Sequence, residues 1–362
     1  MKKTIEIFLN EKNYLLNSNF LKKSKFQDKL SSEISQCLNC ERKCKINVGR
    51  TGHCQTRINH RGKIFTIVHG VISAKSINPI EKKPLYHFYP GSRALTIGTY
   101  GCNFDCFWCQ NHNISHPELV IIDLLKNNQN YYSPEKMVNE ALKNNCQGTS
   151  ISFNEPTLLF EYSLDVFKLA RKKGLYNTFV SNGYMTENVL KELIKSGLDA
   201  INIDIKGDSG MVKEYCGADV EKIWRNAILA KKLGVHVEIT TLVIDNMNSN
   251  DEIIKGISER IVEDLGELTP FHLNRFFPQY KSTHYEIRKA TSLKILKNAF
   301  NIAKKSGLKF VYLGNISNDI YSNTTCPSCS KIVLKRNSFN IEENNLDFKG
   351  KCKYCGFKIC VI

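Results

Sequence analysis

The sequence predicts an α/β fold built around an open, partial (β/α)6 TIM-like barrel, with a cysteine-rich segment before it and a zinc-ribbon-like segment after it. Three observations lead to this prediction. From residue 93 on, short runs rich in Ile, Val and Phe alternate with longer helical stretches, a pattern typical of parallel strands joined by right-handed crossovers. Most of the 14 cysteines fall into three separate groups along the chain. Hydrophobic residues make up 42% of the 362 residues, enough for a full core.

The chain is expected to have three parts. Residues 1–91 form a cysteine-rich segment and a connector, residues 92–318 the barrel, and residues 319–362 the ribbon-like segment. The first 30 residues suggest a polar leader, for which a helix is one option. Three prolines within residues 79–91 predict an extended connector. The last segment is rich in turn-forming residues and is expected to be non-helical.

The barrel prediction assigns strands and helices in turn. Strands are expected at residues 94–97, 149–153, 177–180, 200–205, 235–243, 271–275 and 309–313, and helices near 134–145, 158–173, 187–196, 220–233, 250–264 and 291–305. Ser133 followed by Pro134 suits a helix start, as does Thr186. Because active sites of such barrels lie at the C-terminal ends of the strands, the residues after each strand are the candidates.

The charge and hydropathy of the chain disfavour a nucleic-acid-binding protein and a membrane protein. The formal net charge is +16, but Lys and Arg are spread along the chain, so nucleic acid is an unfavoured partner. A zinc-dependent nucleic-acid-binding protein is the non-enzymatic alternative. No apolar run reaches the roughly 18 residues of a membrane helix, and none follows the basic start as in a signal peptide. We therefore expect a cytoplasmic protein, in which grouped cysteines indicate metal ligation rather than disulfides.

One cysteine group directly follows the first expected barrel strand. Cys102, Cys106 and Cys109 lie within eight residues, and three thiolates on one loop can bind three irons of a 4Fe–4S cluster. A structural cluster takes four cysteines. Three cysteines leave one iron without a protein ligand, and the amino and carboxylate groups of S-adenosylmethionine (SAM) can bind there. His112 leaves a Cys3His zinc site as the alternative.

The spacing C-x3-C-x2-C, with an aromatic residue before the last cysteine, resembles the signature of radical SAM enzymes. The strings IEKKPLYHFYPGSRAL, GCNFDCFWCQN, FNEPT, SNGY, NIDIKG, EITTLVI and FHLNRFFPQYK resemble one subgroup, the AmmeMemoRadiSam-system enzymes, which are relatives of pyruvate formate-lyase activating enzyme. The resemblance runs from about Cys37 to Cys355. It implies reductive cleavage of SAM to a 5′-deoxyadenosyl radical that acts on a small organic or nucleotide-like substrate. A glycyl-radical-enzyme activase is the second hypothesis.

The same resemblance implies partners and SAM contacts. A reductant such as flavodoxin or ferredoxin is expected, and proteins of the AMMECR and Memo families are expected in the same pathway. The residues expected to contact SAM are Asn154 and Glu155 (ammonium group), Ser181, Asn182 and Gly183 (ribose or carboxylate), Asp204 and Lys206 (carboxylate), and Phe107, Trp108, Thr240, Thr241 and Val243 (adenine). Val180 stands where related activating enzymes carry an Asp, so no monovalent cation is expected.

Each assignment has a structural alternative. Residues 154–156 could be a strand-to-helix turn, 181–183 an ordinary turn, and Asp204 and Lys206 a structural ion pair. Trp108 could be a core residue. His272 and Arg275, on the sixth expected strand, are assigned to substrate binding, with a core histidine as the alternative for His272.

Two cysteine groups flank the barrel. Cys326, Cys329, Cys352 and Cys355 form two C-x2-C knuckles, which suits a structural zinc site; rubredoxin-like iron and a site without metal are the alternatives. Cys37, Cys40, Cys44 and Cys54 are expected to form a second metal site, either zinc or an iron–sulfur cluster, in which His53 could replace one thiol. A thiol-rich lid without metal is the alternative.

Overall fold

The computed structural model describes residues 4–126, 130–317 and 319–362. The protein has an α/β fold with a sheet of eight strands, β9 to β16. The chain divides into two compact units, each described by itself. The first comprises Met1–Ile77, Leu95–Asp105 and Cys109–Asp199, and the second Asn78–Ala94, Cys106–Trp108 and Ala200–Ile362. The predicted boundaries at residues 91 and 318 stay a prediction.

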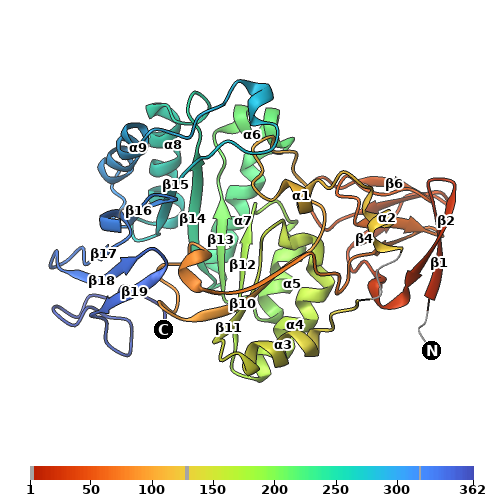
Figure 1. Ribbon diagram of the computed structural model, residues 1–362, viewed down its shortest axis with the longest axis horizontal. Helices are drawn as coiled ribbons and strands as arrows, with labels where there is room; N and C mark the ends of the chain where they lie inside the picture. The colour runs from red at the N-terminus through yellow and green to blue at the C-terminus, as the bar shows by residue number, and fades with distance from the viewer. Residues whose placement is uncertain (1–3, 127–129, 318) are drawn as a thin grey trace. The chain divides into compact units, whose positions relative to one another are not determined.

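The first unit carries the early part of the sheet. It contains β11 (Gly148–Ile151), β12 (Tyr176–Ser181) and most residues of β9 (Ala74–Pro79) and β10 (Arg93–Gly98), and the strand order is β9-β10-β11-β12. β11 and β12 run parallel, with Gly148 opposite Tyr176. The helices of this part are α1 (His112–Ser115), α2 (Ile121–Leu125), α3 (Pro134–Lys143), η3 (Pro156–Leu159), α4 (Phe160–Lys172) and α5 (Glu187–Ser196). α4 packs against both α3 and α5 (Figure 1).

The predicted helix starts use different contacts. The Ser133 hydroxyl accepts a hydrogen bond from the Lys136 backbone N–H at 3.2 Å, as an N-cap should. Thr186 also stands at the N-cap position of α5, but its hydroxyl donates to the carbonyl of Leu38 at 2.8 Å. Thr186 therefore ties the start of α5 to the N-terminal segment.

The second unit continues the sheet with four parallel strands. They follow one another as β13 (Ala200–Asp204), β14 (His236–Val243), β15 (Phe271–Arg275) and β16 (Val311–Gly314). Asp204 lies opposite Thr240, and Val243 opposite Arg275, so these side chains share one end of the sheet. The helices are η2 (Ile80–Lys82), α6 (Ser209–Cys216), α7 (Val220–Lys232), α8 (Asp251–Arg260), a π-helical turn η4 (Ile261–Leu265), η5 (Ser282–Tyr285), α9 (Leu293–Lys305) and η6 (Asp319–Tyr321).

The sheet has more strands than the six predicted for the barrel core. β16 corresponds to the seventh expected strand, whereas β9 lies where the sequence suggested no strand and partly overlaps the predicted connector. The sequence of β9, AKSINP, is polar and ends in proline. Such a composition is tolerated because β9 ends the strand order and is an edge strand.

The expectation of a polar leader was wrong. β1 (Thr4–Leu9) and β2 (Lys12–Asn17) form an antiparallel hairpin. Asn10 and Glu11 both have positive φ, the conformation of a tight two-residue hairpin turn. Alternate residues of the hairpin are buried, which is the strand period that the leader prediction overlooked.

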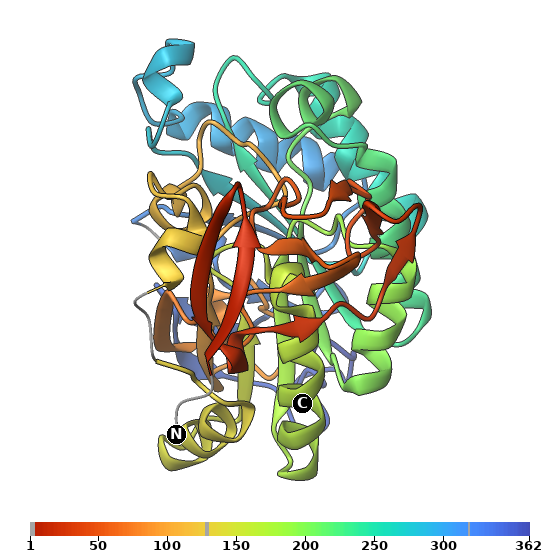
Figure 2. The same cartoon turned by 90° about the vertical axis from the view of Figure 1, so that its right-hand side faces the viewer.

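Small sheets complete the N-terminal part (Figure 2). One has the order β3-β8-β7 and the other β4-β5-β6. Their strands are β3 (Lys22–Lys23), β4 (Gln27–Lys29), β5 (Ile34–Cys37), β6 (Lys45–Asn47), β7 (Arg57–His60) and β8 (Lys63–Thr66), and η1 (Ser18–Phe20) precedes β3.

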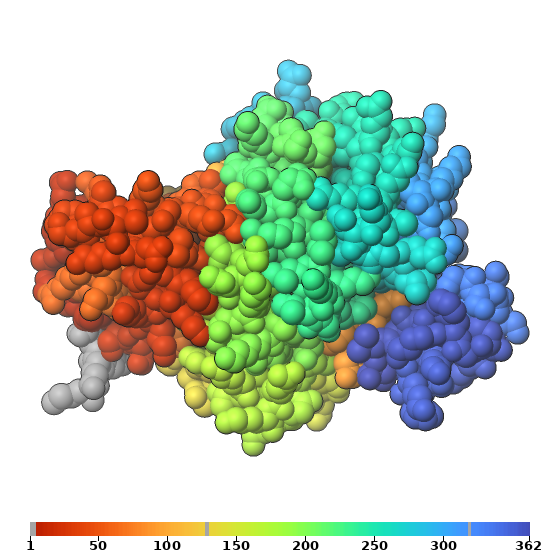
Figure 3. All heavy atoms as spheres, turned by 180° about the vertical axis from the view of Figure 1, so that it is seen from behind, coloured from red at the N-terminus to blue at the C-terminus, as the bar shows by residue number. Residues whose placement is uncertain are grey.

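The C-terminal segment is a small antiparallel sheet of β17 (Thr324–Thr325), β18 (Ile332–Asn337) and β19 (Asn340–Asn344), in agreement with its non-helical composition. It shares one hydrophobic core with Tyr86, Phe310 and Tyr312 of the same unit. The buried Arg336 donates to the carbonyl of Tyr86 at 2.8 Å and lies over the Tyr86 ring. Residues 79–91 therefore pack against the C-terminal sheet and are not the isolated extended connector that the sequence predicted (Figure 3).

No helix in the described part of the chain is long and apolar enough to cross a membrane.

Candidate active site and metal sites

The loop after β10 carries the three cysteines of the predicted cluster motif. Gly101 precedes Cys102 and has φ +88°, and a Cβ there would come within 2.6 Å of the carbonyl oxygen of Cys54. Only glycine fits this close approach. Cys102 is half-buried, and its Sγ accepts a hydrogen bond from the Phe104 backbone N–H at 3.4 Å. A donor of this kind stabilises a metal-bound thiolate.

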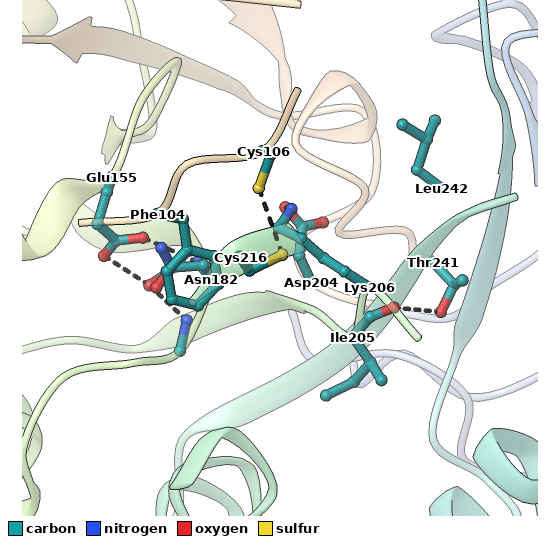
Figure 4. A network of polar contacts seen from close by, with 12 residues as sticks. Phe104, Cys106, Glu155, Asn182, Asp204, Ile205, Lys206, Cys216, Thr241 and Leu242 are labelled. Carbon is teal, nitrogen blue, oxygen red and sulfur yellow. Dashed lines mark hydrogen bonds and ion pairs between the residues drawn. The ribbon is translucent and has the colours of Figure 1, made fainter. Parts of the chain in front are cut away.

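Cys106 lies beside a cysteine that spacing could not identify. Cys106 is 7% exposed, and its Sγ is 3.5 Å from the Sγ of Cys216, at the end of α6 (Figure 4). The contact with Cys216 and burial raise the pKa of the Cys106 thiol. Cys216 stands alone in the sequence, 110 residues from Cys106, so no local motif indicated it.

Asp204 and Lys206 form an ion pair where β13 ends. The Lys206 Nζ is 3.0 Å from the Asp204 carboxylate, and both side chains are largely shielded from solvent. Burial opposes the charge of Lys206, but the adjacent Asp204 carboxylate raises its pKa above the usual range. Lys206 is therefore a firmly charged cation near Cys106.

Phe107 and Trp108 belong to an aromatic cluster. The Phe107 ring stacks on Tyr285 with centroids 3.9 Å apart, and Trp108 meets the Phe107 and Tyr215 rings edge-on. The Lys281 backbone N–H donates to the Phe107 carbonyl at 2.9 Å. This packing fixes residues 106–108 within their unit and favours the core alternative for Trp108.

Glu155 is the centre of a buried network after β11. Its carboxylate accepts hydrogen bonds from the Ser181 hydroxyl and the Asn182 backbone N–H, each at 2.9 Å, and from Thr157. Burial raises the pKa of Glu155, and these donors oppose the rise. With four donors on it, the carboxylate holds the loop after β12 in place (Figure 4).

Asn154 and Asn182 link neighbouring loops. The Asn154 amide donates to the Gly101 carbonyl at 2.7 Å and accepts from the Thr99 N–H at 3.1 Å. Asn182 donates to the side chain of Asn103 at 2.7 Å. Phe153, just before Asn154, has φ +72°, a strained conformation for a bulky residue. These contacts favour a role for Asn154 and Asn182 in positioning the neighbouring loops over direct contact with the SAM ammonium group.

The predicted adenine-side residues lie on β14. The Thr241 hydroxyl donates to the Ile205 carbonyl at 2.7 Å, which joins β14 to the segment after β13. The Thr240 hydroxyl is buried without a hydrogen-bond partner among the described residues. Of the predicted adenine-side residues, Thr240 is therefore the one whose hydroxyl can form a hydrogen bond to a ligand. The Val243 side chain is buried. Gly183 has φ +71° in the turn after β12.

His272 is 2% exposed and belongs to a polar network inside the second unit. Its Nε2 lies 2.6 Å from the carboxylate of Glu238, which His236 approaches at 2.9 Å. Burial opposes the charge of Glu238, but both histidines lower its pKa below the usual range. The His272 ring also stacks on Tyr312. This placement favours the alternative, a satisfied core histidine.

Arg275 is partly buried at the end of β15. Its Nε donates to the Thr291 carbonyl at 2.7 Å, and its guanidinium lies 5.0 Å from the Phe277 ring centroid. Because its other guanidinium nitrogens can still donate hydrogen bonds, Arg275 is a stronger candidate for substrate binding than His272.

The four C-terminal cysteines come together. Their sulfur atoms all lie within 4.8 Å of one another, with Cys326 and Cys355 at 3.5 Å and Cys329 and Cys352 at 3.7 Å. Sulfurs of a tetrahedral zinc site are separated by about 3.8 Å, as Zn–S bonds of about 2.3 Å require. Both knuckles turn alike, because Ser330 and Gly356 each have positive φ and donate to the first cysteine of their knuckle.

The N-terminal cysteines Cys37, Cys40, Cys44 and Cys54 line one cavity with Arg57 and Asn103. His53 Nε2 is 3.0 Å from Asp105. His112, the fourth ligand in the alternative zinc site of the central loop, places its Nδ1 3.3 Å from the carbonyl of Cys109.

Comparisons with known proteins give the class. A family model described as the radical SAM superfamily matches residues 96–257. "Uncharacterized protein MJ0808" of Methanocaldococcus jannaschii is 37% identical over 351 residues, which is 94% of this chain and 100% of that protein. The chain belongs to the radical SAM superfamily, whose members are enzymes that cleave SAM.

Two further proteins are similar over shorter spans. "Putative glycyl-radical enzyme activating enzyme MJ1227" of the same organism is 27% identical, over 53% of this chain and 76% of its own length. A solved domain of pyruvate-formate lyase-activating enzyme from Bacteroides vulgatus is 18% identical with a TM-score of 0.40, over 46% of this chain and 99% of that domain.

Proposed function

We propose that this enzyme holds a 4Fe–4S cluster on Cys102, Cys106 and Cys109 and cleaves SAM reductively. Such a cluster, when bound, supplies the electron that breaks the C5′–S bond of SAM and yields a 5′-deoxyadenosyl radical. The observation that carries the proposal is a three-thiol loop in the matched family region, with a backbone donor already directed at Cys102. Three thiolates suit a cluster with one open iron better than a closed structural site.

The chain's own residues would bind and orient SAM. We assign Lys206 to the SAM carboxylate, since it is a shielded cation near Cys106 and charge-assisted hydrogen bonds are the strong ones. Asp204 holds the Lys206 ammonium in place. Glu155 acts as a positioning residue, because it fixes Ser181 and Asn182 rather than facing an open space. The unpartnered Thr240 hydroxyl is assigned to the nucleoside part.

The finer assignments are also part of the proposal. We infer membership of the AmmeMemoRadiSam-system subgroup, a small organic or nucleotide-like substrate contacted by Arg275, partners of the AMMECR and Memo families, and flavodoxin or ferredoxin as reductant. Zinc is assigned to Cys326, Cys329, Cys352 and Cys355, and the sulfur spacing supports it. The second candidate is a glycyl-radical-enzyme activase, favoured by the similarity to the putative glycyl-radical enzyme activating enzyme MJ1227.

The test is SAM cleavage by anaerobically reconstituted protein. Wild-type protein with a strong reductant should form 5′-deoxyadenosine, and Cys106→Ala should lose the central cluster and this activity while keeping zinc. Cys146→Ser, a buried cysteine outside the three groups, is the matched control and should retain both. Full 5′-deoxyadenosine formation by Cys106→Ala would refute the proposal. A glycyl-radical doublet on a co-incubated partner protein would favour the activase.

A further inference from the structure

The four N-terminal cysteines face a common cavity within the first unit. A turn closes the chain between them: Lys43 has φ +46° and its N–H donates to the Cys40 carbonyl, while the Cys37 N–H donates to the Cys44 carbonyl at 2.9 Å. Cys54 lies in the turn that precedes β7. The cavity is partly open to solvent.

Three side-chain nitrogen atoms in the cavity wall have no hydrogen-bond partner among the residues that the structure describes. The Arg57 side chain is about 3% exposed, and its Nη1 pairs with Glu161 at 2.7 Å, yet its Nε is buried without an acceptor among the described residues. The side-chain nitrogens of Asn39 and Asn103 are also buried and unpartnered there. All three residues line the cavity. Unsatisfied buried donors are costly, and together they call for an anionic acceptor inside the cavity.

The sulfur spacing distinguishes this group from the C-terminal one. Among the described residues, the C-terminal four are the group whose ligand atoms all lie within 4.8 Å. No three of the N-terminal thiols meet that condition, although zinc would need sulfurs about 3.8 Å apart. Thiolates bound to different irons of a cluster lie farther apart, on the order of 6 Å for a 4Fe–4S cube.

The cavity borders the loop that carries Cys102. Asn103 follows Cys102 directly and lines the cavity. Arg42, between Cys40 and Cys44, donates to the Asn103 carbonyl and pairs with Asp105 at 3.2 Å. His53 meets the same carboxylate at 3.0 Å, which occupies its Nε2 and leaves the four thiols as the natural ligand set. Gly101 lies against the Cys54 carbonyl.

We propose that Cys37, Cys40, Cys44 and Cys54 bind a second iron–sulfur cluster that passes electrons to the cluster on the Cys102 loop. Four thiolates are the normal ligand set of such clusters, and the N–H groups of Arg57, Asn39 and Asn103 donate to its sulfur atoms. A low-potential one-electron donor of the flavodoxin or ferredoxin class reduces this cluster by one electron. The cluster is reoxidised when that electron moves to the central cluster, and no covalent bond forms or breaks in the transfer. The relay rests on the proposed function, whereas the site itself does not.

The site is tested in protein that lacks the central ligands. The triple variant Cys102→Ala, Cys106→Ala, Cys109→Ala, reconstituted with iron and sulfide, should retain iron with an equal amount of sulfide. About two or four irons per chain are expected, as a 2Fe–2S or 4Fe–4S cluster requires. Its Mössbauer spectrum should be unaffected by SAM. Loss of all cluster iron from this variant, or zinc bound by the N-terminal thiols, would overturn the proposal. Because the central cysteines are absent, this result does not depend on SAM chemistry.

The relay is tested with Cys44→Ser in the otherwise intact chain. The ratio of flavodoxin-driven to dithionite-driven 5′-deoxyadenosine formation should fall about tenfold or more, while Cys146→Ser keeps the wild-type ratio. An unchanged ratio in a Cys44→Ser protein that has lost the second cluster would overturn the relay. If Cys44→Ser does not fold, Arg57→Lys provides the same ratio measurement with all four thiols present.

Discussion

Lys206 is the residue whose surroundings define the candidate SAM site most clearly. It lies two residues from Asp204 on the same strand end, 3.0 Å from its carboxylate, and close enough to the Cys106 thiol to be influenced by it. Two opposite charges in a shielded position are weak contributors to stability. Their presence here is better explained by a ligand that exchanges contacts with the pair.

Lys206→Ala should therefore weaken SAM binding by about 1.5–3 kcal/mol, the range for a hydrogen bond to a charged group. Iron content should stay the same, since Lys206 ligates no metal. Equilibrium binding of SAM to the reconstituted protein measures the change, with the exposed Lys213→Ala as matched control. Unaltered affinity in folded Lys206→Ala protein would mean that the pair is structural.

Contacts between side chains that are far apart in the sequence could not be predicted. The spacing of Cys102, Cys106 and Cys109 identified the motif, but nothing local indicated that Cys216 lies beside Cys106. Glu155 was found as a strand-end carboxylate, but its direction toward Ser181 and Asn182 depends on how β11 and β12 pair. His272 was assigned to substrate, although Glu238 and Tyr312 enclose it.

At the scale of elements, the ends of β11 and β12 are joined by the Glu155 carboxylate. The Ser181 hydroxyl and the Asn182 backbone N–H both donate to this carboxylate, and the site is buried. A carboxamide at this position would present an N–H group to an N–H group. The loop after β12 would then lose its anchor.

Glu155→Gln should accordingly lower the free energy of unfolding by about 1–3 kcal/mol, the cost of leaving a buried donor unsatisfied. Chemical denaturation under anaerobic conditions measures it. Glu135→Gln, on the exposed face of α3, should change stability by less than about 0.5 kcal/mol, as is usual for surface substitutions. Equal stability of the two variants would show that Glu155 anchors nothing.

Helices and central strands were predictable because their apolar periods are strong. α5 (Glu187–Ser196) has the predicted bounds, and α3 and α7 begin at the predicted residues. The hairpin β1–β2 and the edge strand β9 were missed, since exposed edges carry polar residues and their pairing is not a local property.

At the scale of the whole chain, the C-terminal sheet is part of the core of its unit. Cys326 and Cys352 belong to the same buried cluster as Tyr86 and Tyr312. His87 donates to or accepts from Tyr312 at 2.6 Å, and Tyr312 meets Thr324 at 2.9 Å. Metal at this site would therefore stabilise more than the ribbon alone.

Cys329→Ser should release zinc and lower the thermal midpoint of the protein, because a three-thiol site binds zinc less tightly and the shared core loosens. Metal analysis and thermal unfolding together measure this, and the exposed Thr325→Ser should keep both zinc and midpoint. Zinc loss with no change in midpoint would show that the ribbon is energetically separate.

The central claim is that SAM binds directly to a cluster on Cys102, Cys106 and Cys109. The most direct measurement is the EPR spectrum of the reduced, reconstituted protein before and after SAM is added, in the quadruple variant Cys37→Ser, Cys40→Ser, Cys44→Ser, Cys54→Ser, so that only the central cluster contributes. We predict a 4Fe–4S signal whose g-values shift with SAM and that shows coupling to a 15N-labelled methionine amino group. A spectrum unchanged by saturating SAM, or zinc in place of iron at these cysteines, would contradict the account.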